Sequence, residues 1–485
     1  MRIAFVSPEV VPFAKTGGLA DVSGALPKAL ARLGMEVVVV MPRYKAVDIK
    51  KFGLKDTKLK VSAPVDKETV EAKLYEGGLP GGVKVYFLDV PRYFDRDQLY
   101  GTPTGDYPDN AERFTWFSKA VPGVLKAVGF SPDIVHVNDW QSGFVPLFLK
   151  AFHKDDPLLG GAATVLTVHN MGYQGTFWAE DMHLTGLGWE YFTPSGIEFY
   201  GKMNVMKAGL IYSDVINTVS KGYSKEIQTP EYGCGLDGVL RARSADLYGI
   251  VNGIDYDEWD PETDKDIAVN FSQGDIKGKQ ANKKALQKEL GLTQGKAPLF
   301  GIITRLADQK GLDILSESLD EMMEMGVQLA LLGTGEEKYH TLFSNLAKKR
   351  PKQVSVTLGF DGKLAKRIYA GSDAFLMPSR YEPCGLGQLI SLRYGTVPLV
   401  RKTGGLADTV KNYNPKTGKG NGFVFTEYSS KAFLRSVKAA LAAYDDKDVW
   451  NKLIGQGMAE DHSWESSARD YVKLYEKARE KAGKR

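Results

Sequence analysis

The sequence predicts an α/β protein made of two doubly wound domains, each with a parallel sheet covered by helices on both faces. Three observations lead to this fold class. The chain has 485 residues, whereas a single hydrophobic core rarely grows beyond about 250–300 residues. Short runs rich in Val and Ile alternate with longer segments of helical period along the whole chain. The heptapeptide at 15–21 recurs letter for letter at 402–408, once in each half.

Six strands are predicted in the first half of the chain, each a short apolar run that ends in polar or glycine residues. The runs are Arg2–Ser7, Glu36–Met41, Val83–Leu88, Ile134–Val137, Thr164–Val168 and Val215–Val219. Unbroken apolar runs of this length are typical of parallel strands buried on both faces. A helical pattern at Val22–Leu33 follows the first strand. The N-terminal run is far shorter than the apolar core of a signal peptide, and no later segment approaches a membrane span in length.

The second half repeats the alternation of strands and helices. Its predicted strands are Leu299–Ile303, Gln328–Leu332, Val354–Leu358, Ala374–Met377 and Val397–Val400. Its predicted helices are Gly311–Met325, Glu336–Lys349 and Leu386–Tyr394. Each of these helices follows a strand, as the crossover connections of a parallel sheet require.

A polar stretch without strand patterns, residues 255–296, separates the two series. We place the linker just before it, at Gly249–Asp255, which gives a first domain of residues 1–248 and a second of residues 249–462. Residues 463–485 remain, and a helix is predicted there at Ser463–Lys484. Its apolar face is Trp464, Ala468, Tyr471, Val472 and Tyr475, and we expect it to pack on the first domain. Ligands of such sheets bind outside the carboxyl ends of the strands, so we expect the site between the domains.

The composition argues against several functional classes. The net charge is +4, from 63 basic and 59 acidic residues, which is too balanced for a protein that binds nucleic acid or a membrane. Cys234 and Cys384 are the only cysteines, so neither a disulfide framework nor a cysteine-rich metal site can form. This suits a reducing compartment, and we expect a cytoplasmic protein. The histidines show no ligand spacing with Asp, Glu or Cys, so we expect no protein-held metal.

The heptapeptide Lys15–Asp21 has the composition of an anion-binding turn. Its paired glycines, Gly17 and Gly18, open a helix, where the backbone can approach a phosphate and the N–H groups favour negative charge. Lys15 adds a full positive charge. The motif is neither a Walker A sequence nor the dinucleotide-binding fingerprint. A purely structural turn is the alternative interpretation.

Two further motifs follow strands in the second half. Arg305 and Lys310 flank a turn before a helix, where they could hold a diphosphate and neutralise the charge that develops as it leaves. Two solvated cations on a loop are the alternative. In the segment Pro378–Gly387, Glu382 could bind sugar hydroxyls while the glycine-rich helix start binds phosphate. Cys384 has no histidine near it in sequence and is interpreted as a packing residue rather than a nucleophile.

Two strand ends in the first half also carry polar residues. The strand at 134–137 runs into Asp139, and the strand at 164–168 runs into His169, which is followed by polar and glycine residues. Both side chains are therefore predicted to lie where a ligand would bind. For His169 a core or surface position is the alternative.

In this order, the motifs resemble those of the bacterial glycogen synthase and plant starch synthase family, retaining glucosyltransferases with two Rossmann-like domains (the GT-B fold). The resemblance covers essentially the whole chain. The segments that carry it are Lys15–Val22, His136–Trp140, Thr167–Gly175, Val251–Asp255, Arg305–Gly311, Pro378–Leu386 and Lys402–Val410. The most specific are the two Lys-Thr-Gly-Gly-Leu copies and the run Glu-Pro-Cys-Gly-Leu at 382–386.

The resemblance implies transfer of glucose from ADP-glucose to the non-reducing end of glycogen or a malto-oligosaccharide, with an α-1,4 link and retained configuration. It implies no metal and no prosthetic group. The implied catalytic residues are Arg305, Lys310, Glu382, His169 and Asp139. The implied substrate-binding residues are Lys15, Gly18, Asp21, Tyr100, Asn170, Asn252, Phe360, Cys384, Gly385 and Leu386.

The family pattern implies a role for each group of these residues. Donor phosphates would be contacted by Lys15 and Gly18, by Arg305 and Lys310, and by the backbone N–H groups of residues 385 and 386. The side chains at 139, 170, 252 and 382 would engage the glucosyl unit or its surroundings. The backbone carbonyl of His169 would face the anomeric carbon. An aromatic ring at position 360 would lie against adenine, and the tyrosine at position 100 would lie on the donor side.

The sequence departs from the family pattern at one position, and other functions stay open. Ile390 stands where related GT-B transferases carry a second glutamate, so a carboxylate contact to ribose is not expected. One alternative is a retaining transferase that uses UDP-glucose and a small acceptor. A phosphorylase is another, although no segment for a lysine bound to pyridoxal phosphate is recognisable. A third alternative is a glucan-binding protein whose catalytic site has decayed. This interpretation predicts that some of Lys15, Arg305, Lys310 and Glu382 are lost, but all four are present.

Overall fold

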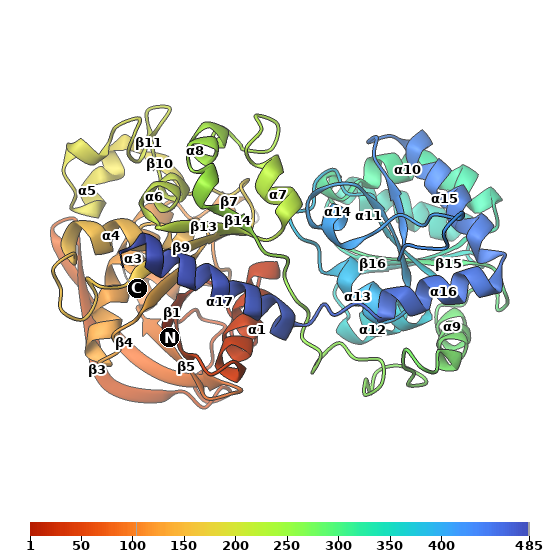
Figure 1. Ribbon diagram of the computed structural model, residues 1–485, viewed down its shortest axis with the longest axis horizontal. Helices are drawn as coiled ribbons and strands as arrows, with labels where there is room; N and C mark the ends of the chain where they lie inside the picture. The colour runs from red at the N-terminus through yellow and green to blue at the C-terminus, as the bar shows by residue number, and fades with distance from the viewer. Residues whose placement is uncertain (103, 484–485) are drawn as a thin grey trace. The chain divides into compact units, whose positions relative to one another are not determined.

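The computed structural model describes residues 1–102 and 104–483, and the chain divides into two compact units, each shown in Figure 1. Unit 1 consists of Met1–Val219, Ser224–Ile250 and Trp464–Arg485, and unit 2 of Ser220–Tyr223 and Val251–Ser463. The main boundary between the units therefore lies after residue 250. The boundary predicted from the sequence was after residue 248. No sequence pattern indicates that residues 220–223 belong to the second unit.

Unit 1 is built on a nine-stranded sheet with the order β14-β13-β9-β8-β1-β2-β5-β4-β3. Its strands are β1 (Arg2–Val6), β2 (Glu36–Pro42), β3 (Lys55–Val65), β4 (Glu68–Leu79), β5 (Val83–Asp89), β8 (Ile134–Asn138), β9 (Ala163–Val168), β13 (Val215–Thr218) and β14 (Leu247–Gly249). From β14 to β5 all neighbours run parallel, and β4 and β3 extend the sheet antiparallel. The predicted strands form its buried centre, because a sheet covered on both faces requires apolar side chains on both.

Helices cover both faces of this sheet. One face carries α1 (Gly18–Arg32) and α17 (Trp464–Lys481), which lie side by side although they are the first and last helices of the chain (Figure 1). The other carries α3 (Asn110–Ala127), α4 (Val145–Phe152) and α6 (Val205–Tyr212). The shorter elements of unit 1 are α2 (Pro91–Phe94), β6 (Gly101–Thr102), β7 (Gly105–Asp106), β10 (Thr176–Trp178), α5 (Met182–Thr185), β11 (Glu198–Phe199), β12 (Lys202–Asn204) and α8 (Asp237–Ala242). Helix α7 (Lys221–Glu226) begins in the segment assigned to unit 2 and ends in unit 1.

The C-terminal helix α17 docks on unit 1 through aromatic side chains. Tyr475 Oη lies 2.8 Å from Nδ1 of His136, and Asn217 Nδ2 donates to Tyr471 Oη at 3.0 Å. Most of the predicted apolar face is buried, but Leu474 is buried where Val472 was expected, and Val472 is only half-buried. The helix ends at Lys481; the predicted end, Lys484, lies outside the described residues.

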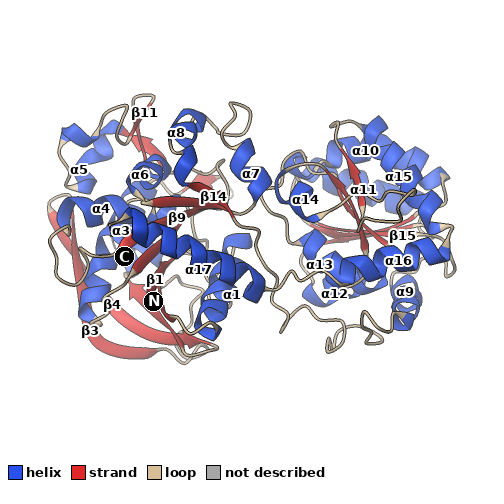
Figure 2. Ribbon diagram, in the orientation of Figure 1, coloured by secondary structure: helices blue, strands red, loops and turns tan. Residues whose placement is uncertain are grey.

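Unit 2 contains a six-stranded sheet, parallel throughout, with the order β17-β16-β15-β18-β19-β20. Its strands are β15 (Leu299–Ile303), β16 (Gln328–Gly333), β17 (Val354–Leu358), β18 (Ala374–Met377), β19 (Val397–Arg401) and β20 (Phe423–Phe425). Helices α10 (Leu312–Glu324), α11 (Glu337–Lys349) and α15 (Ser430–Tyr444) cover one face (Figure 2). Helices α9 (Lys277–Glu289), α12 (Gly362–Gly371), α13 (Gly387–Arg393) and α16 (Lys447–Met458) cover the other, and α14 (Gly404–Thr409) follows β19.

The structure differs from the sequence expectation in identifiable places. The long antiparallel strands β3 and β4 were not predicted, although buried Val70, Ala72 and Leu74 alternate with exposed Glu71 and Lys73 in β4. This alternation is the signal of a half-buried strand. Strand β20 was missed because three residues carry too little pattern. Helix α1 begins at residue 18 rather than 22, since the glycine pair itself enters the helix.

In both sheets the order of the parallel strands reverses beside one central strand, and this reversal indicates where a ligand would bind. In unit 1 the chain order of the parallel strands reverses beside β1, whose neighbours are β2 and β8; in unit 2 it reverses beside β15, whose neighbours are β16 and β18. Ligands of doubly wound sheets bind at such a reversal, outside the carboxyl ends of the strands. Within the described part of the chain no helix is long and apolar enough to cross a membrane.

Candidate active site

Unit 2 brings two of the predicted motifs together at its strand reversal. Strands β15 and β18 are neighbours, so the turns that follow them leave the same edge of the sheet. Lys310 Nζ donates to Glu382 Oε2 at 2.7 Å, and Ser379 Oγ donates to the same oxygen at 3.0 Å. Glu382 is 6% exposed. A charge pair this poorly hydrated is held more rigidly than one at the surface, because water screens it less.

Arg305 lies on the turn that follows β15. Its side chain is exposed, and Nη2 donates to Gln309 Oε1 at 3.2 Å, within the same turn. Lys310 is more enclosed, with 17% of its side chain exposed. The unit therefore presents one cation to solvent and holds the other against a carboxylate. A ligand with two phosphates could engage both, since Arg binds phosphate through a fixed fork and Lys as a point charge.

The second copy of the repeated heptapeptide supports the Glu382 turn from behind. Gly405 N–H donates to the carbonyl oxygens of Glu382 at 3.1 Å and Pro383 at 3.2 Å. A Cβ on Gly404 would lie 2.0 Å from the Glu382 carbonyl oxygen, and one on Gly405 would lie 2.2 Å from that of Cys384. These glycines are needed for close backbone packing, because a Cβ on either would overlap the turn.

The turn is also fixed through Cys384 and its neighbours. Cys384 is buried, and burial raises the pKa of its thiol to about 12, so it behaves as the predicted packing residue. The backbone N–H of Asn252 points to its sulfur. Asn252 is itself buried, and its Oδ1 has no hydrogen-bond partner among the described residues. Gly385 has φ +75°, and Leu386 precedes α13 directly.

Phe360 follows β17 at the same edge of the unit 2 sheet. Its side chain is 89% exposed, the largest exposed fraction among the large hydrophobic side chains of the described residues. A phenylalanine so exposed loses the free energy that burial of its ring would provide. The exposure leaves the ring available to stack on a flat ligand group. Ile390, by contrast, is buried in the core of unit 2.

In unit 1 the first copy of the heptapeptide lies open where the second copy is packed. A Cβ on Gly17 or Gly18 would meet no atom within 4 Å. Lys15 Nζ is 2.7 Å from Asp21 Oδ1, and about half of the Lys15 side chain is exposed. Burial raises the pKa of Asp21, opposed by the nearby Lys15 ammonium. The two identical sequences thus differ in their packing, because only the first copy leaves open space beside its glycines.

A buried carboxylate that the sequence analysis missed lies behind this loop. Glu9 is 4% exposed. Its Oε2 accepts the backbone N–H groups of Thr16 at 2.5 Å and Gly17 at 3.2 Å, and its Oε1 accepts the hydroxyl groups of Thr16 at 2.6 Å and Tyr100 at 2.7 Å. Two of the loop's N–H groups are therefore already satisfied by the protein. Burial raises the pKa of Tyr100 well above its usual value. An acid three residues beyond a strand gives no sequence pattern that reveals such contacts.

Asp139 and His169 meet at the ends of β8 and β9. Asp139 has φ 53°, in the left-handed region that side chains rarely adopt. This backbone turns its carboxylate so that Oδ1 accepts the N–H of His169 at 2.7 Å. Burial raises the pKa of Asp139 to about 7, even though the backbone N–H groups of His169 and Asn170 oppose the shift. Strain of this kind persists only where surrounding contacts fix it.

The imidazole of His169 is turned inward. Its Nε2 lies 3.0 Å from Asn138 Oδ1, and burial lowers the pKa of the ring to about 3, so it is neutral at pH 7. Asn170 Oδ1 accepts the N–H of Gly172 at 2.9 Å and so shapes the turn after β9. A pocket of about 410 Å³ in unit 1 is lined by this turn, by Asp106, Asn110, Trp140 and Cys234, and by the start of β10.

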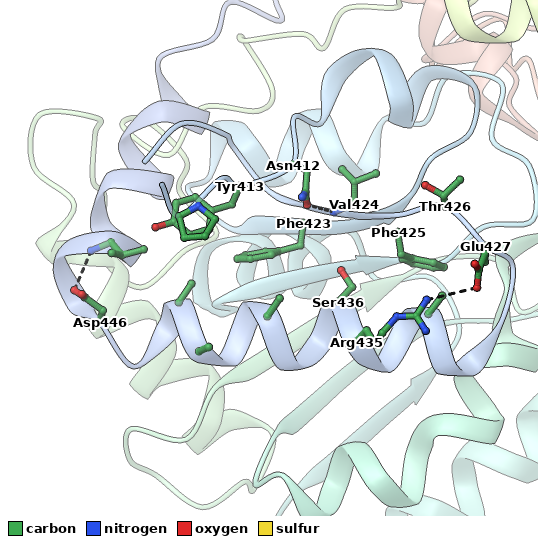
Figure 3. A pocket seen from close by; sticks show the side chains of 16 residues that line it. Asn412, Tyr413, Phe423, Val424, Phe425, Thr426, Glu427, Arg435, Ser436 and Asp446 are labelled. Atoms are coloured by element: carbon green, nitrogen blue, oxygen red, sulfur yellow. Dashed lines mark hydrogen bonds and ion pairs between the residues drawn. The ribbon is translucent and has the colours of Figure 1, made fainter. Parts of the chain in front are cut away.

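A cavity of about 710 Å³ lies elsewhere, at the far edge of the unit 2 sheet (Figure 3). It lies between β20, the turn before that strand and the alanine-rich face of α15. None of the predicted site residues lines it. Among the described residues, no group of three or more His, Cys, Asp or Glu side chains is placed to hold a metal ion.

Comparison with known proteins identifies the family of this chain. Residues 2–242 match the family described as "Starch synthase catalytic domain", and residues 283–453 match "Glycosyl transferases group 1". A glycogen synthase from Fervidobacterium nodosum is 52% identical, and the match covers 99% of both chains. One from Koribacter versatilis is 48% identical over the same shares. The chain belongs to the glycogen and starch synthase family.

Solved structures place this family member in the GT-B fold. The catalytic domain of starch synthase IV from Arabidopsis thaliana, bound to ADP and acarbose, superposes with a TM-score of 0.91 at 34% identity and covers 99% of both chains. A sucrose-phosphate synthase from Thermosynechococcus elongatus, at 18% identity and a TM-score of 0.60 over 98% of both chains, shows the fold alone. The predicted fold is confirmed, and so is the predicted activity of a glycogen synthase that transfers glucosyl units from a nucleotide sugar to a glucan.

Proposed function

We propose that this glycogen synthase takes ADP-glucose as its donor and extends the non-reducing ends of α-1,4-glucans with retained configuration, releasing ADP. The observation that carries the proposal is the strand reversal of unit 2, where Lys310 is paired with a buried Glu382 beside the exposed Arg305. The starch synthase that is similar over the whole chain was solved with ADP and acarbose. Both ligands fit a site for a nucleoside diphosphate and a glucan.

In this proposal, unit 2 binds the nucleotide. Arg305 and Lys310 hold the diphosphate, and the backbone N–H groups of Gly385 and Leu386 bind its distal phosphate. The exposed ring of Phe360 stacks on the adenine. No carboxylate contacts the ribose from position 390, because that residue is an isoleucine, and its side chain is buried in the core.

Unit 1 contributes contacts to the donor sugar and its phosphates. Lys15 and Gly18 bind the phosphates from the open loop, with Asp21 orienting the lysine. Tyr100 lies on the donor side. Asp139 and Asn170, together with Asn252 and Glu382 of unit 2, engage the glucosyl unit or its surroundings, and the backbone carbonyl of His169 faces the anomeric carbon.

The proposed chemistry needs no covalent bond between sugar and enzyme. The bond from the anomeric carbon to the diphosphate oxygen breaks, and the acceptor 4-oxygen bonds to the same face of that carbon. The leaving diphosphate takes the proton of the acceptor hydroxyl. The protein then supplies positioning and stabilises the charge that develops on the diphosphate. The pair of catalytic carboxylates that a glycoside hydrolase requires is not needed.

We also propose that the reaction uses no metal or prosthetic group and that the protein works in the cytoplasm. Its two cysteines, Cys234 and Cys384, are both free thiols, as a reducing compartment keeps them. Full activity after exhaustive dialysis against EDTA is the expected result. Loss of activity that returns with one divalent metal would contradict the proposal.

The donor assignment is tested by incorporation of labelled glucose into glycogen from ADP-glucose and UDP-glucose in parallel. Lys310→Ala should lower kcat/KM for ADP-glucose by about a hundredfold or more, because removal of a charged group that stabilises a leaving group usually has an effect of that size. Lys438→Ala is the matched control: Lys438 is 59% exposed and pairs with Glu321 on the surface of unit 2. Incorporation from UDP-glucose alone would overturn the donor, and unchanged kinetics in Lys310→Ala would overturn the role of the lysine.

A further inference from the structure

The contacts of Glu9 give this residue a role that no sequence motif predicted. It follows β1 by three residues and is almost fully buried. Its carboxylate receives four hydrogen bonds, three of them from the loop that carries Lys15 and one from Tyr100. A buried carboxylate must be fully hydrogen-bonded to be tolerated, and this one is satisfied almost wholly by a single exposed loop.

The loop has little else in its own sequence to hold it. Thr16, Gly17 and Gly18 are exposed, and the two glycines have open space where side chains would stand. Glycines lose more conformational freedom on ordering than any other residue. The chain before residues 15–18 is held by the backbone bridge between Val10 and Ala14, and the chain after them by α1, but the turn itself depends on acceptors for its N–H groups. One carboxylate oxygen of Glu9 accepts two of those N–H groups, and the other accepts the Thr16 hydroxyl.

Resting on the function proposed above, we infer that Glu9 is a positioning residue that presets the Lys15 loop and Tyr100 together for the donor. Glu9 uses the N–H groups of Thr16 and Gly17, which leaves the ammonium group of Lys15 and the N–H of Gly18 to face the donor phosphates. A loop that is ordered before the donor arrives loses little conformational entropy when the donor binds, so binding is tighter. One carboxylate oxygen of Glu9 binds both Thr16 and Tyr100. The position of the Lys15 loop and the position of Tyr100, both proposed to contact the sugar donor, therefore depend on the same group.

The role depends on hydrogen-bond geometry rather than on negative charge, and this separates two substitutions. Glu9→Gln can keep all four contacts, because its carbonyl oxygen can accept the two backbone N–H groups while its amide donates to the hydroxyls of Thr16 and Tyr100. A hydroxyl can accept as readily as it donates. Glu9→Met fills a similar space with an adaptable apolar chain but accepts none of the four hydrogen bonds.

Two readouts follow the loop. Trypsin cleavage after Lys15, mapped by mass spectrometry on the full chain, reports how often the loop opens, without any need for activity. Steady-state kinetics separates KM for ADP-glucose from KM for glycogen. We expect Glu9→Met to raise both the cleavage rate and KM for ADP-glucose by about tenfold or more, since the loss of one hydrogen bond to a charged group has that effect on an equilibrium. KM for glycogen should change little.

Controls keep the inference open to failure. Glu9→Gln should stay within about threefold of the parent protein in both readouts, because its hydrogen bonds are kept. Lys60→Ala, which removes one partner of a surface ion pair with Glu71 elsewhere in unit 1, should alter neither readout. If Glu9→Met does not fold, Thr16→Ala removes one of the four contacts at an exposed site, and cleavage after Lys15 should still increase.

Two results would overturn the inference. One is a Glu9→Met protein, or failing that a Thr16→Ala protein, with unchanged cleavage after Lys15. The other is a Glu9→Gln protein as defective as Glu9→Met, which would mean that the charge itself is required. If the parent protein transfers no glucose from ADP-glucose, the proposed donor is wrong, and the protease readout alone still decides whether Glu9 holds the loop.

Discussion

At the scale of single residues, the two copies of the heptapeptide show that identical sequences can have different surroundings. The copy in unit 1 leaves its glycines open, whereas the copy in unit 2 is packed against the turn that carries Glu382. Gly405 N–H donates to the carbonyl oxygens of residues 382 and 383. The second copy therefore supports the Glu382 turn from behind, whereas the first leaves open space beside its glycines.

This contrast predicts that substitution of glycine by alanine destabilises the protein in the second copy but not in the first. Gly404 has φ +43°, and a Cβ there would lie 2.0 Å from the Glu382 carbonyl oxygen. We expect Gly404→Ala to lower the free energy of unfolding of unit 2 by about 1–3 kcal/mol and to reduce kcat by displacing Glu382. Gly17, with φ −148° and open space around it, should tolerate alanine within about 0.5 kcal/mol. Denaturant unfolding of both variants checks this, and equal losses of stability would contradict it.

At the scale of secondary-structure elements, helix α17 completes unit 1 from the opposite end of the sequence. Its buried face packs on β8, β9 and β13 and on α1. The centre of the contact is polar: His136 lies between Tyr475 and Thr167, whose Oγ1 is 2.7 Å from the imidazole Nε2. Hydrogen bonds inside an apolar contact fix the position of the helix, because any shift leaves buried polar groups unpaired.

A single hydroxyl tests how much this polar contact contributes. Tyr475→Phe keeps the ring but leaves Nδ1 of His136 without its partner at 2.8 Å. We expect the free energy of unfolding of unit 1 to fall by about 1–3 kcal/mol, the usual effect of an unpaired buried polar group. Lys473→Ala is the control on the same helix: its side chain is 70% exposed and pairs with Asp470, so a change within about 0.5 kcal/mol is expected. A Tyr475→Phe protein as stable as the parent would show that the contact is unimportant.

At the scale of the whole molecule, unit 1 places titratable groups in its interior with opposite shifts. Burial lowers the pKa of His136 to about 3 and raises the pKa of Asp139 to about 7. Between pH 3 and 6.5 the unfolded chain binds a proton at position 136 that the folded chain refuses, so this histidine lowers stability as the pH falls. Between pH 3.8 and 7 the folded chain holds a proton at position 139 that the unfolded chain releases, which has the opposite effect.

The histidine effect can be isolated by measuring a slope. The free energy of unfolding of unit 1 should lose about 1.4 kcal/mol per pH unit from His136 as the pH falls from about 6 to 4. In His136→Gln this contribution disappears, so the pH dependence should flatten by that amount, whatever the variant does to stability at pH 7. Denaturant titrations across this pH range measure the difference. Parallel curves for the two proteins would mean that His136 is protonated in the folded state.

The fold could be predicted from the sequence because its signals are local and repeated. The buried parallel strands are unbroken apolar runs, and the motifs follow strands at a constant place. Strands β3 and β4, helix α9 and strand β20 were not recovered, since half-exposed or very short elements carry weak patterns. The turns that carry Lys310 and Glu382 could be recognised as candidates, because ligands of doubly wound sheets bind outside the carboxyl ends of the strands, where both turns begin.

The sequence by itself determined the class of fold, the division into two parts and the family, since periodicity and motif order are properties of the chain alone. Tertiary structure decided which groups act together. Only folding joins Lys310 to Glu382, packs one glycine pair while the other stays open, and brings Glu9 to the loop and Tyr100. The physical reason is that hydrogen bonds, burial and steric space depend on neighbours distant in sequence, which no local pattern specifies.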